Sequence, residues 1–567
     1  MREQREEKVS NSGASRSLCV FGAALLWILP IAVSWADPSF DARKLAVANR
    51  GAKPFAAPEL PPAKRAWLDQ VYSQASPGPV WFTPEGPLPA TGVALDALRN
   101  AADRGLLPGD YDVDALEREF AALRAGRREP DAAKRVDEAM TATMLCFLSD
   151  LRFGRVPPQQ VEPHYRARAK DAVFVGKLRD AVAHDQIAAL IDAVEPEFPL
   201  YGRLKRLLAE YRSLAALPSI VLPPFAPPRG KIVAGDFYAG APALRTLLIR
   251  LGDLDRDATK STDERYTQTL ADAVRRFQAR HGLQPDGVLG RETLAALNVP
   301  LATRLTQIRL SLERLRWLPE LPPGPLIAIN IPSFQLWAFE AASDSQHAKF
   351  SMPVVVGKAM RNETPVFIGE MRFVEFSPYW NVPPSILRKE LLPRLASDPA
   401  YLEREDMELV STSHDGRTYA VDSDEGIAAL RSGEARLRQR PGRGNALGGV
   451  KFVLPNTMDI YLHATPATEL FERTRRDFSH GCIRVGDPEL LAQFVLNGKP
   501  EWTPDTIEAA MTSGVNRTVP LAAPLPVIVF YTTALVERDG RPLFLADIYG
   551  HDRKLLDALR SSARLDR

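Results

Sequence analysis

Cysteine is scarce in this chain, and its charges nearly cancel. Only three cysteines occur in 567 residues, too few for a disulfide framework or a cysteine-rich zinc module. The 72 Lys and Arg residues stand against 70 Asp and Glu residues, which leaves a formal net charge of +2. A nearly neutral protein has no summed positive field to hold nucleic-acid phosphates. These shortages exclude a disulfide scaffold and a polybasic nucleic-acid binder.

Long apolar runs are also missing, apart from one near the N-terminus. Residues 18–33 form an apolar run of 16 residues, short of the roughly 20 that span a bilayer. Basic residues precede the run, and Ser34-Trp-Ala36 ends it, a pattern typical of a cleaved secretory signal. We therefore predict that residues 1–36 are a signal peptide and that the mature protein is exported without a membrane span. The alternative is an uncleaved anchor.

Cleavage after Ala36 would leave two cysteines, Cys146 and Cys482. Cys146 lies in an apolar helical pattern, which predicts an inert core residue. Cys482 would then be a free thiol in an oxidising compartment, which is unusual enough to need a functional reason. A disulfide between the two is the structural alternative.

The first half of the chain has the spacing of helices, and the length predicts about three or four domains. Residues 37–230 are predicted to be a helical scaffold domain that ends in a proline-rich connector, with a helical apolar spacing at Leu204, Leu207, Leu208 and Tyr211. Residues 231–300 are predicted to be a small helical module, because one apolar stripe is formed by Leu270, Ala273, Val274 and Phe277. A connecting helix is expected over 301–323.

Apolar residues recur with a period of two from residue 324 onward, which predicts a mainly β domain over 324–552. Strands are expected at 326–331, 335–339, 352–357, 371–376 and 527–531. A charged, helix-prone stretch at about 385–445 is predicted to be an insert that covers a cleft as a lid. Residues 553–567 are expected to be a C-terminal tail. The predicted fold class is thus multidomain α+β.

Two short segments carry the chemistry: Tyr461-Leu-His-Ala-Thr465 and Ser479-His-Gly-Cys-Ile-Arg-Val485. A thiol reacts as thiolate and needs a neighbouring imidazole to accept its proton, so Cys482 is the candidate nucleophile and His463 the candidate base. The amides of Gly481 and Cys482 could point at a developing oxyanion, since glycine permits close backbone approach. Arg484 offers a planar fork for a substrate carboxylate.

A metal site is the sharper alternative to thiol catalysis. His463, His480 and Cys482 are ligand types found in zinc enzymes. Zinc would usually require a further ligand or a catalytic carboxylate, and the acids nearby in sequence are Asp477 and Asp487. We favour nucleophilic thiol catalysis with no metal and no cofactor. A purely structural role for these residues is the third reading.

Two stretches resemble known families. Residues 273–298 are similar to the three-helix peptidoglycan-binding module of cell-wall enzymes, with Phe-Gln, Gly-Leu, Asp-Gly and Gly-x-x-Thr-Leu in order. Ser-His-Gly-Cys-Ile-Arg, with a histidine 19 residues before the cysteine, resembles the signature of YkuD-type L,D-transpeptidases. Further phrases resemble the large Gram-negative members of that family: Leu315-Arg-Trp-Leu-Pro319, Asn330-Ile-Pro, Pro378-Tyr-Trp-Asn-Val-Pro383, Pro441-Gly-x-x-Asn-Ala-Leu-Gly448, Lys451-Phe and Asp547-Ile-Tyr-Gly550.

The resemblance implies a periplasmic enzyme that cross-links peptidoglycan. It would attack a donor tetrapeptide stem, release the terminal D-Ala and pass the acyl group to an acceptor amine. By position, Cys482 matches the nucleophile and His463 the proton acceptor and donor. The oxyanion and structural part would fall to Ser479, His480 and Gly481, and substrate binding to Arg484, Tyr461, Trp380 and Asn445.

One position departs from the family pattern. Related large enzymes often carry Asp after the upstream histidine, where this chain has Ala464. In the family a backbone carbonyl can orient the imidazole instead. Two rival functions remain: a carboxypeptidase or endopeptidase that uses water as acceptor, and a wall-binding protein without catalysis.

Overall fold

The computed structural model describes residues 60–565, apart from the short stretches 74–77, 126–130, 167–169, 226–229, 258–261, 322, 342–346, 399, 414–415 and 422. The predicted signal peptide, residues 1–36, lies outside the described residues. Among the helices that are described, none combines the length and the apolar character needed to cross a membrane.

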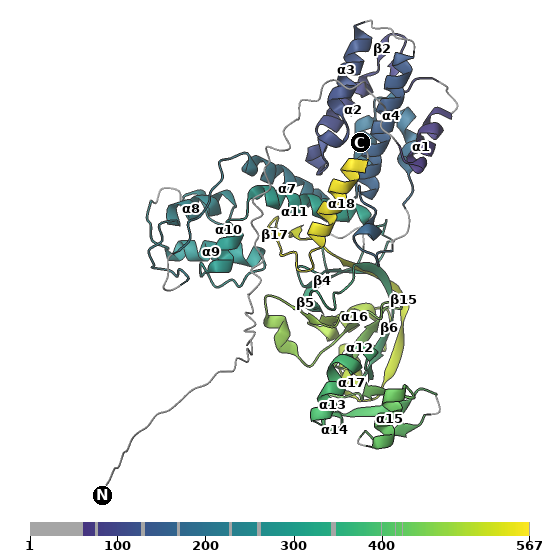
Figure 1. Cartoon of the computed structure of the whole chain (residues 1–567), viewed down its shortest axis with the longest axis vertical. Coiled ribbons are helices and arrows are strands. Elements are labelled where there is room, and N and C mark those ends of the chain that lie inside the picture. Colours follow the sequence, from purple (N-terminus) through teal and green to yellow (C-terminus); the bar gives the residue numbers. More distant parts are fainter. Residues whose placement is uncertain are drawn as a thin grey trace, which may run out of the picture. The chain divides into compact units, whose positions relative to one another are not determined.

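The first described region is helical, as its spacing predicts (Figure 1). A small hairpin of β1 (Phe82–Thr83) and β2 (Gly86–Pro87) lies between its first two helices. The helices are α1 (Pro62–Ser73), α2 (Pro89–Arg99), α3 (Val113–Arg124), α4 (Ala132–Phe153), α5 (Val173–Ala183), α6 (Ile187–Val194) and α7 (Pro199–Ala215). Helices α1 to α6 share one buried apolar cluster. The stripe Leu204, Leu207, Leu208 and Tyr211 of α7 is buried against α11 (Leu301–Trp317).

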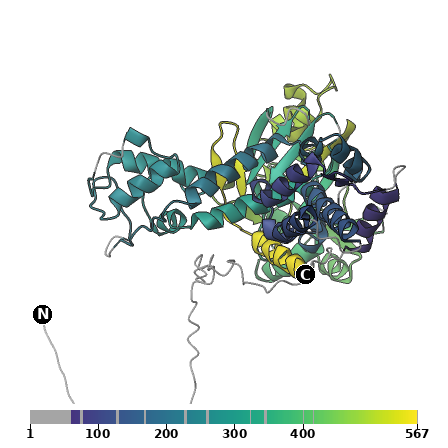
Figure 2. The same ribbon diagram turned by 90° about the horizontal axis from the view of Figure 1, so that it is seen from above.

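Three helices form a small module with a core of its own: α8 (Ala241–Arg250), α9 (Gln268–Arg280) and α10 (Arg291–Leu297). They lie together in both Figures 1 and 2. The apolar stripe predicted on α9 is buried in this core. The helix ends at Arg280, and Gly282 adopts a positive φ of 65° just beyond it, a conformation that glycine takes without strain.

A nine-stranded sheet dominates the second half of the chain. Its strands run in the order β13-β5-β14-β12-β11-β6-β15-β3-β4, and an additional pairing of β4 with β5 closes the sheet on itself. The strands are β3 (Leu326–Asn330), β4 (Gln335–Phe339), β5 (Phe350–Gly357), β6 (Phe367–Phe376), β11 (Val450–Val453), β12 (Leu462–His463), β13 (Asp477–Ser479), β14 (Ile483–Val485) and β15 (Arg517–Phe530). All five strands that the sequence predicts are present.

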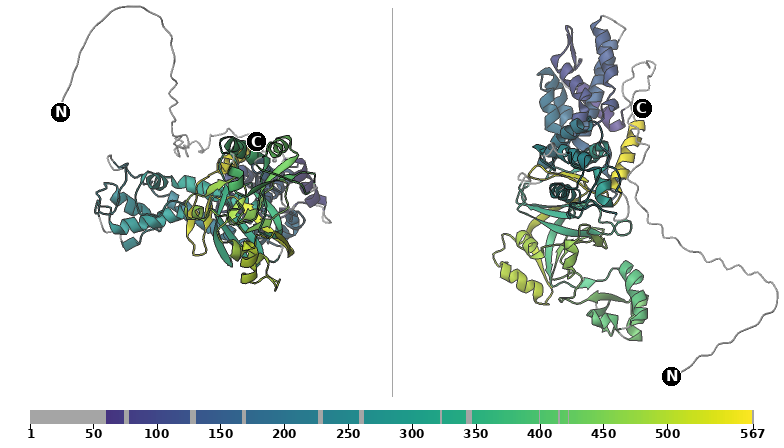
Figure 3. Two further views of the ribbon diagram at one scale, coloured as in Figure 1. Left: turned by 90° about the horizontal axis from the view of Figure 1, so that it is seen from below. Right: turned by 90° about the vertical axis from the view of Figure 1, so that its left-hand side faces the viewer.

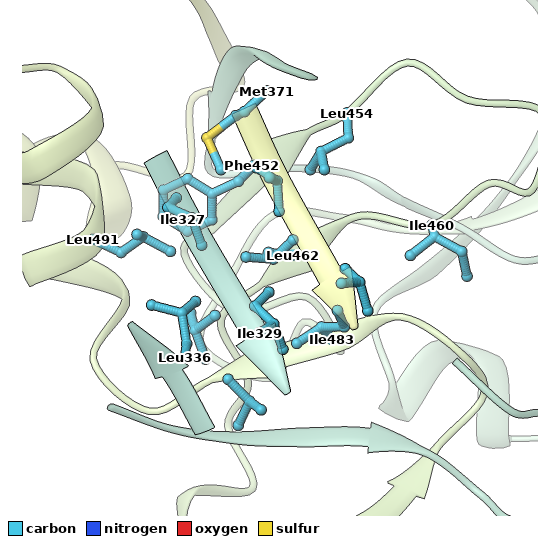
Figure 4. Close-up of a cluster of buried hydrophobic side chains, with 14 of the residues drawn as sticks. Ile327, Ile329, Leu336, Met371, Phe452, Leu454, Ile460, Leu462, Ile483 and Leu491 are labelled. Atoms are coloured by element: carbon cyan, nitrogen blue, oxygen red, sulfur yellow. The ribbon is translucent and has the colours of Figure 1, made fainter. Parts of the chain in front are cut away.

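The core of this sheet is aliphatic and aromatic. Figure 4 shows Ile327, Phe452, Leu462 and Ile483, from four different strands, meeting inside it. Helices α16 (Pro488–Val495) and α17 (Pro504–Thr512) pack against the same core. Trp317, at the end of α11, is also part of it.

The insert differs from the expectation of a helical lid. It contains a π-helical turn over Leu387–Leu391 and α12 (Pro384–Ile386), α13 (Leu392–Ser397), α14 (Tyr401–Arg404) and α15 (Asp424–Ser432). It also contains a four-stranded sheet, in the order β7 (Trp380–Asn381), β10 (Ala435–Gln439), β8 (Met407–Ser411) and β9 (Thr418–Tyr419). These elements surround a small core of their own, and their ribbons can be followed in Figure 3.

The end of the chain also differs from the expectation of a simple tail. A hairpin of β16 (Ala534–Val536) and β17 (Pro542–Phe544) precedes helix α18 (His551–Leu565). Leu555 of α18 is fully buried in the core of the sheet.

The two cysteines expected in the mature chain form no disulfide with each other, and Cys146 lies partly exposed on α4.

Candidate active site

Three neighbouring strands place the predicted base beside two cationic residues. Strand β12 lies between β11 and β14, with His463 opposite Lys451 on one side and opposite Arg484 on the other. Side chains alternate between the two faces of a strand. Leu462 and Ile483 point into the core, so His463, Arg484 and Lys451 lie together on the other face.

The row of polar side chains extends one strand further. Glu375 of β6 pairs with Lys451 in register, and the two side chains form an ion pair at 3.5 Å. Charged or ionisable side chains therefore cross four adjacent strands: Glu375, Lys451, His463 and Arg484. Neither Glu375 nor the ion pair was predicted, although the alternation of side chains along Lys451-Phe could have placed Lys451 on this face.

Cys482 sits at the turn into β14 and is half-buried. The amide of Ile483 donates to the carbonyl of Tyr461 at 3.0 Å, which holds Cys482 beside Tyr461. The thiol lies 3.5 Å from the carbonyl oxygen of Asp459. Burial raises the pKa of Cys482, against the hydrogen bonds from Tyr461 and the charge of Lys451, which act to lower it. The resting nucleophile is therefore a protonated thiol.

His463 is buried, and its tautomer is defined by a backbone carbonyl. Its Nδ1 lies 2.5 Å from the carbonyl oxygen of Ala464. A carbonyl only accepts hydrogen bonds, so Nδ1 carries the proton and Nε2 of the neutral ring is the acceptor. The carbonyl of Ala464 thus orients the imidazole.

The electrostatic surroundings keep the His463 imidazole neutral. Burial, followed by the charge of Arg484, lowers its pKa to about 3; Lys451 adds to this, and the carbonyls of Ala464 and Leu447 oppose it. At neutral pH the ring can therefore accept a proton from the thiol during attack, but it does not hold a preformed thiolate as an ion pair. His463 lies two residues beyond Tyr461 along β12, and the two rings are in edge-to-face contact at 5.7 Å.

The turn that carries the nucleophile is held by Ser479. Its hydroxyl donates to the carbonyl of Cys482 at 2.6 Å and accepts the amide of Gly481 at 3.1 Å. The expectation that the Gly481 amide faces the oxyanion is therefore not met in this conformation. Among the described residues the amide of Cys482 has no hydrogen-bond partner, so it remains the available donor.

His480 points away from the other candidate ligands. It is exposed, and its Nε2 lies 2.6 Å from Oε1 of Glu390 in the π-helical turn of the insert. A metal held by His463, His480 and Cys482 would require His480 to leave this contact. Within the described ranges no group of three His, Cys, Asp or Glu side chains is arranged to hold an ion.

Of the four residues expected to bind substrate, Tyr461 lies beside Cys482, and the other three have different surroundings. The Nε of Arg484 is buried without a hydrogen-bond partner, and burial lowers the pKa of this guanidinium. Trp380 packs on the core of the insert. Asn445 is buried, and its amide donates to the carbonyls of Pro378 and Arg440 at 3.0 and 2.9 Å. Among the described residues the Nε of Arg484 thus lacks a partner, whereas the side chain of Asn445 joins two backbone segments.

Comparisons with known proteins agree with this architecture. Residues 324–504 match the family model described as the L,D-transpeptidase catalytic domain, YkuD. Residues 240–297 match the "Putative peptidoglycan binding domain" and residues 66–208 a scaffold domain. The chain is thus modular, with a match to a different family model in each part. The match of residues 324–504 is to the YkuD family of L,D-transpeptidase catalytic domains.

Individual relatives are more distant. The "Putative L,D-transpeptidase" of Haemophilus influenzae is 31% identical over 272 residues, which cover 47% of this chain and 53% of that protein. The chain thus spans about half the length of this relative. A solved L,D-transpeptidase from Xylanimonas cellulosilytica is 15% identical, covering 54% of this chain and 100% of that one, with a TM-score of 0.16.

Proposed function

We propose that this protein is a murein L,D-transpeptidase that forms 3→3 peptidoglycan cross-links through an acyl-enzyme on Cys482. One observation carries the proposal. The neutral imidazole of His463 is on β12, and the half-buried thiol of Cys482 is at the turn into the neighbouring strand β14; burial lowers the pKa of the imidazole and raises that of the thiol. Nucleophilic catalysis by a thiol requires this pairing.

The acylation step uses the side chains of this face. The sulfur of Cys482 attacks the carbonyl carbon of the donor stem, and its proton passes to Nε2 of His463. The amide of Cys482 stabilises the oxyanion, and the guanidinium of Arg484 holds a stem carboxylate. His463 then returns the proton to the amine of the leaving D-Ala.

Deacylation completes the cross-link. The amine of an acceptor stem attacks the thioester, His463 accepts its proton, and the thiolate of Cys482 leaves and is reprotonated. Water in place of the amine would make the same site a carboxypeptidase or an endopeptidase. The two outcomes share the acyl-enzyme, so only the products distinguish them.

The cross-linking experiment is a digest of purified sacculi or tetrapeptide muropeptides incubated with the full mature chain. We expect 3→3 dimers and free D-Ala by mass spectrometry, and neither product with Cys482→Ala. Release of D-Ala without dimers would assign the hydrolytic activity instead. No acylation of Cys482 by any stem peptide would refute the proposed function.

We further propose that the module within residues 231–300 retains the protein on the wall and that the protein acts in the periplasm. The residues assigned to the chemistry all lie in the part after residue 324. Deleting residues 235–298 should therefore weaken retention on sacculi and leave acylation of Cys482 by a small donor peptide intact. A folded deletion variant that cannot be acylated would show that the module is part of the active site.

A further inference from the structure

Of the four backbone N–H and C=O groups of Gly481 and Cys482, three have a hydrogen bond in the described structure. The amide of Gly481 and the carbonyl of Cys482 are both bonded to the hydroxyl of Ser479. The carbonyl of Gly481 accepts a hydrogen bond at 2.7 Å from the hydroxyl of Thr364. Only the amide of Cys482, at the junction of these groups, is left without a partner in the described structure.

Thr364 is fully buried, in the segment that links β5 to β6. Its hydroxyl accepts the amide of Gly357 at 2.8 Å, so its own proton is directed to the carbonyl of Gly481. The amide of Thr364 donates to the hydroxyl of Tyr549 at 3.2 Å, and that hydroxyl donates to the carbonyl of Gly357 at 2.5 Å. The Thr364 hydroxyl therefore has one defined direction.

The position of the Gly481 carbonyl determines where the Cys482 amide points. The carbonyl and the following N–H belong to one planar trans peptide unit and lie antiparallel. Gly481 has a φ of 119°, and glycine has the widest rotational freedom of any residue. Without a bond to its carbonyl, this peptide plane could rotate and take the Cys482 N–H with it.

We propose that Thr364 is a positioning residue for acyl transfer, because its hydroxyl aims the Cys482 amide at the oxyanion. This inference rests on the proposed acylation of Cys482. In that step the carbon–sulfur bond forms, the carbonyl π electrons move to oxygen, and the thiol proton passes to His463. Thr364 does not touch the substrate; it acts through the peptide unit between Gly481 and Cys482.

Two reagents separate this role from general support of the fold. p-Nitrophenyl acetate acylates a thiol through an oxyanion, whereas iodoacetamide alkylates it by direct displacement without one. Both rates are measured on the full chain, and the rates of Cys482→Ala are subtracted to remove the contribution of Cys146. The ratio of acylation to alkylation then reports stabilisation of the oxyanion.

Thr364→Val removes the hydroxyl and keeps the shape of the side chain. We expect acylation to fall about 10- to 100-fold, which is less than the loss of an oxyanion donor itself, and alkylation to change less than about threefold. Thr364→Ser should restore the ratio. The control is Thr91→Val, since Thr91 is a buried threonine whose hydroxyl bonds the carbonyl of Trp81 at 3.1 Å; its ratio should stay at the wild-type value.

Equal losses in both rates, or no loss in acylation, would overturn the role of Thr364. If Thr364→Val does not fold, the same ratio is measured with Thr364→Ala. The ester is independent of the natural substrate. An unchanged ratio therefore refutes the positioning role, whereas failure of stem peptides to acylate the wild type refutes the proposed function.

Discussion

The rates of two reactions of Cys482 should depend on pH in different ways, because the nucleophile and its base both rest uncharged. Burial raises the pKa of Cys482 above the ordinary thiol range, so the thiol is protonated at pH 7. The pKa of His463 is lowered to about 3, so at pH 5 only about one imidazole in a hundred is protonated. Lowering the pH thus inactivates the base only near pH 3.

Alkylation by iodoacetamide requires thiolate already present, so its rate should rise about tenfold per pH unit between pH 6 and 9. Acylation by a donor peptide should be nearly constant from pH 5 to 8, because neutral His463 accepts the proton as the sulfur attacks. In His463→Ala the alkylation profile should change little, while acylation should fall about 10²- to 10⁴-fold. Quenched-flow sampling with mass spectrometry measures both rates.

An alkylation step with a midpoint between pH 4 and 7 that disappears in His463→Ala would refute this reasoning. Such a step is the property of a preformed thiolate–imidazolium pair. It would mean that the raised pKa of Cys482 and the lowered pKa of His463 are both wrong in direction.

Two further predictions concern arginines. Arg484→Ala should lower kcat/KM for the donor by about 10- to 100-fold, since a charge-assisted bond contributes about 1.5–3 kcal/mol, and Arg484→Lys should recover only part of it; an unchanged kcat/KM with a normal melting temperature would remove Arg484 from substrate binding. Arg280→Met should destabilise the helical module by about 3–5 kcal/mol, because Asp253 stays buried and loses the guanidinium that now donates two hydrogen bonds to it. Hydrogen exchange of residues 241–297 measures the loss of stability, and unchanged protection would contradict the prediction.

The large sheet could be predicted from the sequence because its strands alternate strongly. Residues 335–339 were expected as a strand, and β4 has those bounds. The small sheet of the insert was missed. Strand β10 does alternate, with Ala435 and Leu437 buried and arginines between them, but the surrounding charge favoured a helical interpretation. The alternation of apolar and polar residues in this segment indicated a strand, but its charged composition led to the prediction of a helix.

The candidate site was predictable in part. The pairing of β12 with β14 places His463 on one strand and Cys482 at the turn into the neighbouring one. The spacing of residues along the sequence could not predict which hydrogen bonds the side chains of the site would form. The hydroxyl of Ser479 occupies the Gly481 amide, and Asn445 is bonded to backbone carbonyls. Thr364 gave no signal, since a single buried threonine 118 residues before Cys482 belongs to no motif.

Helix α11 limits how this protein can be divided. Leu310 and Trp317 complete the core of the nine-stranded sheet, while Ile308 and Leu312 on the same helix pack against α7. A fragment beginning at residue 324 would therefore leave apolar core positions open to water. The catalytic domain should therefore not be expressed alone from residue 324, where its family match begins. A recombinant fragment should begin before Leu301 and include a substitute for α7.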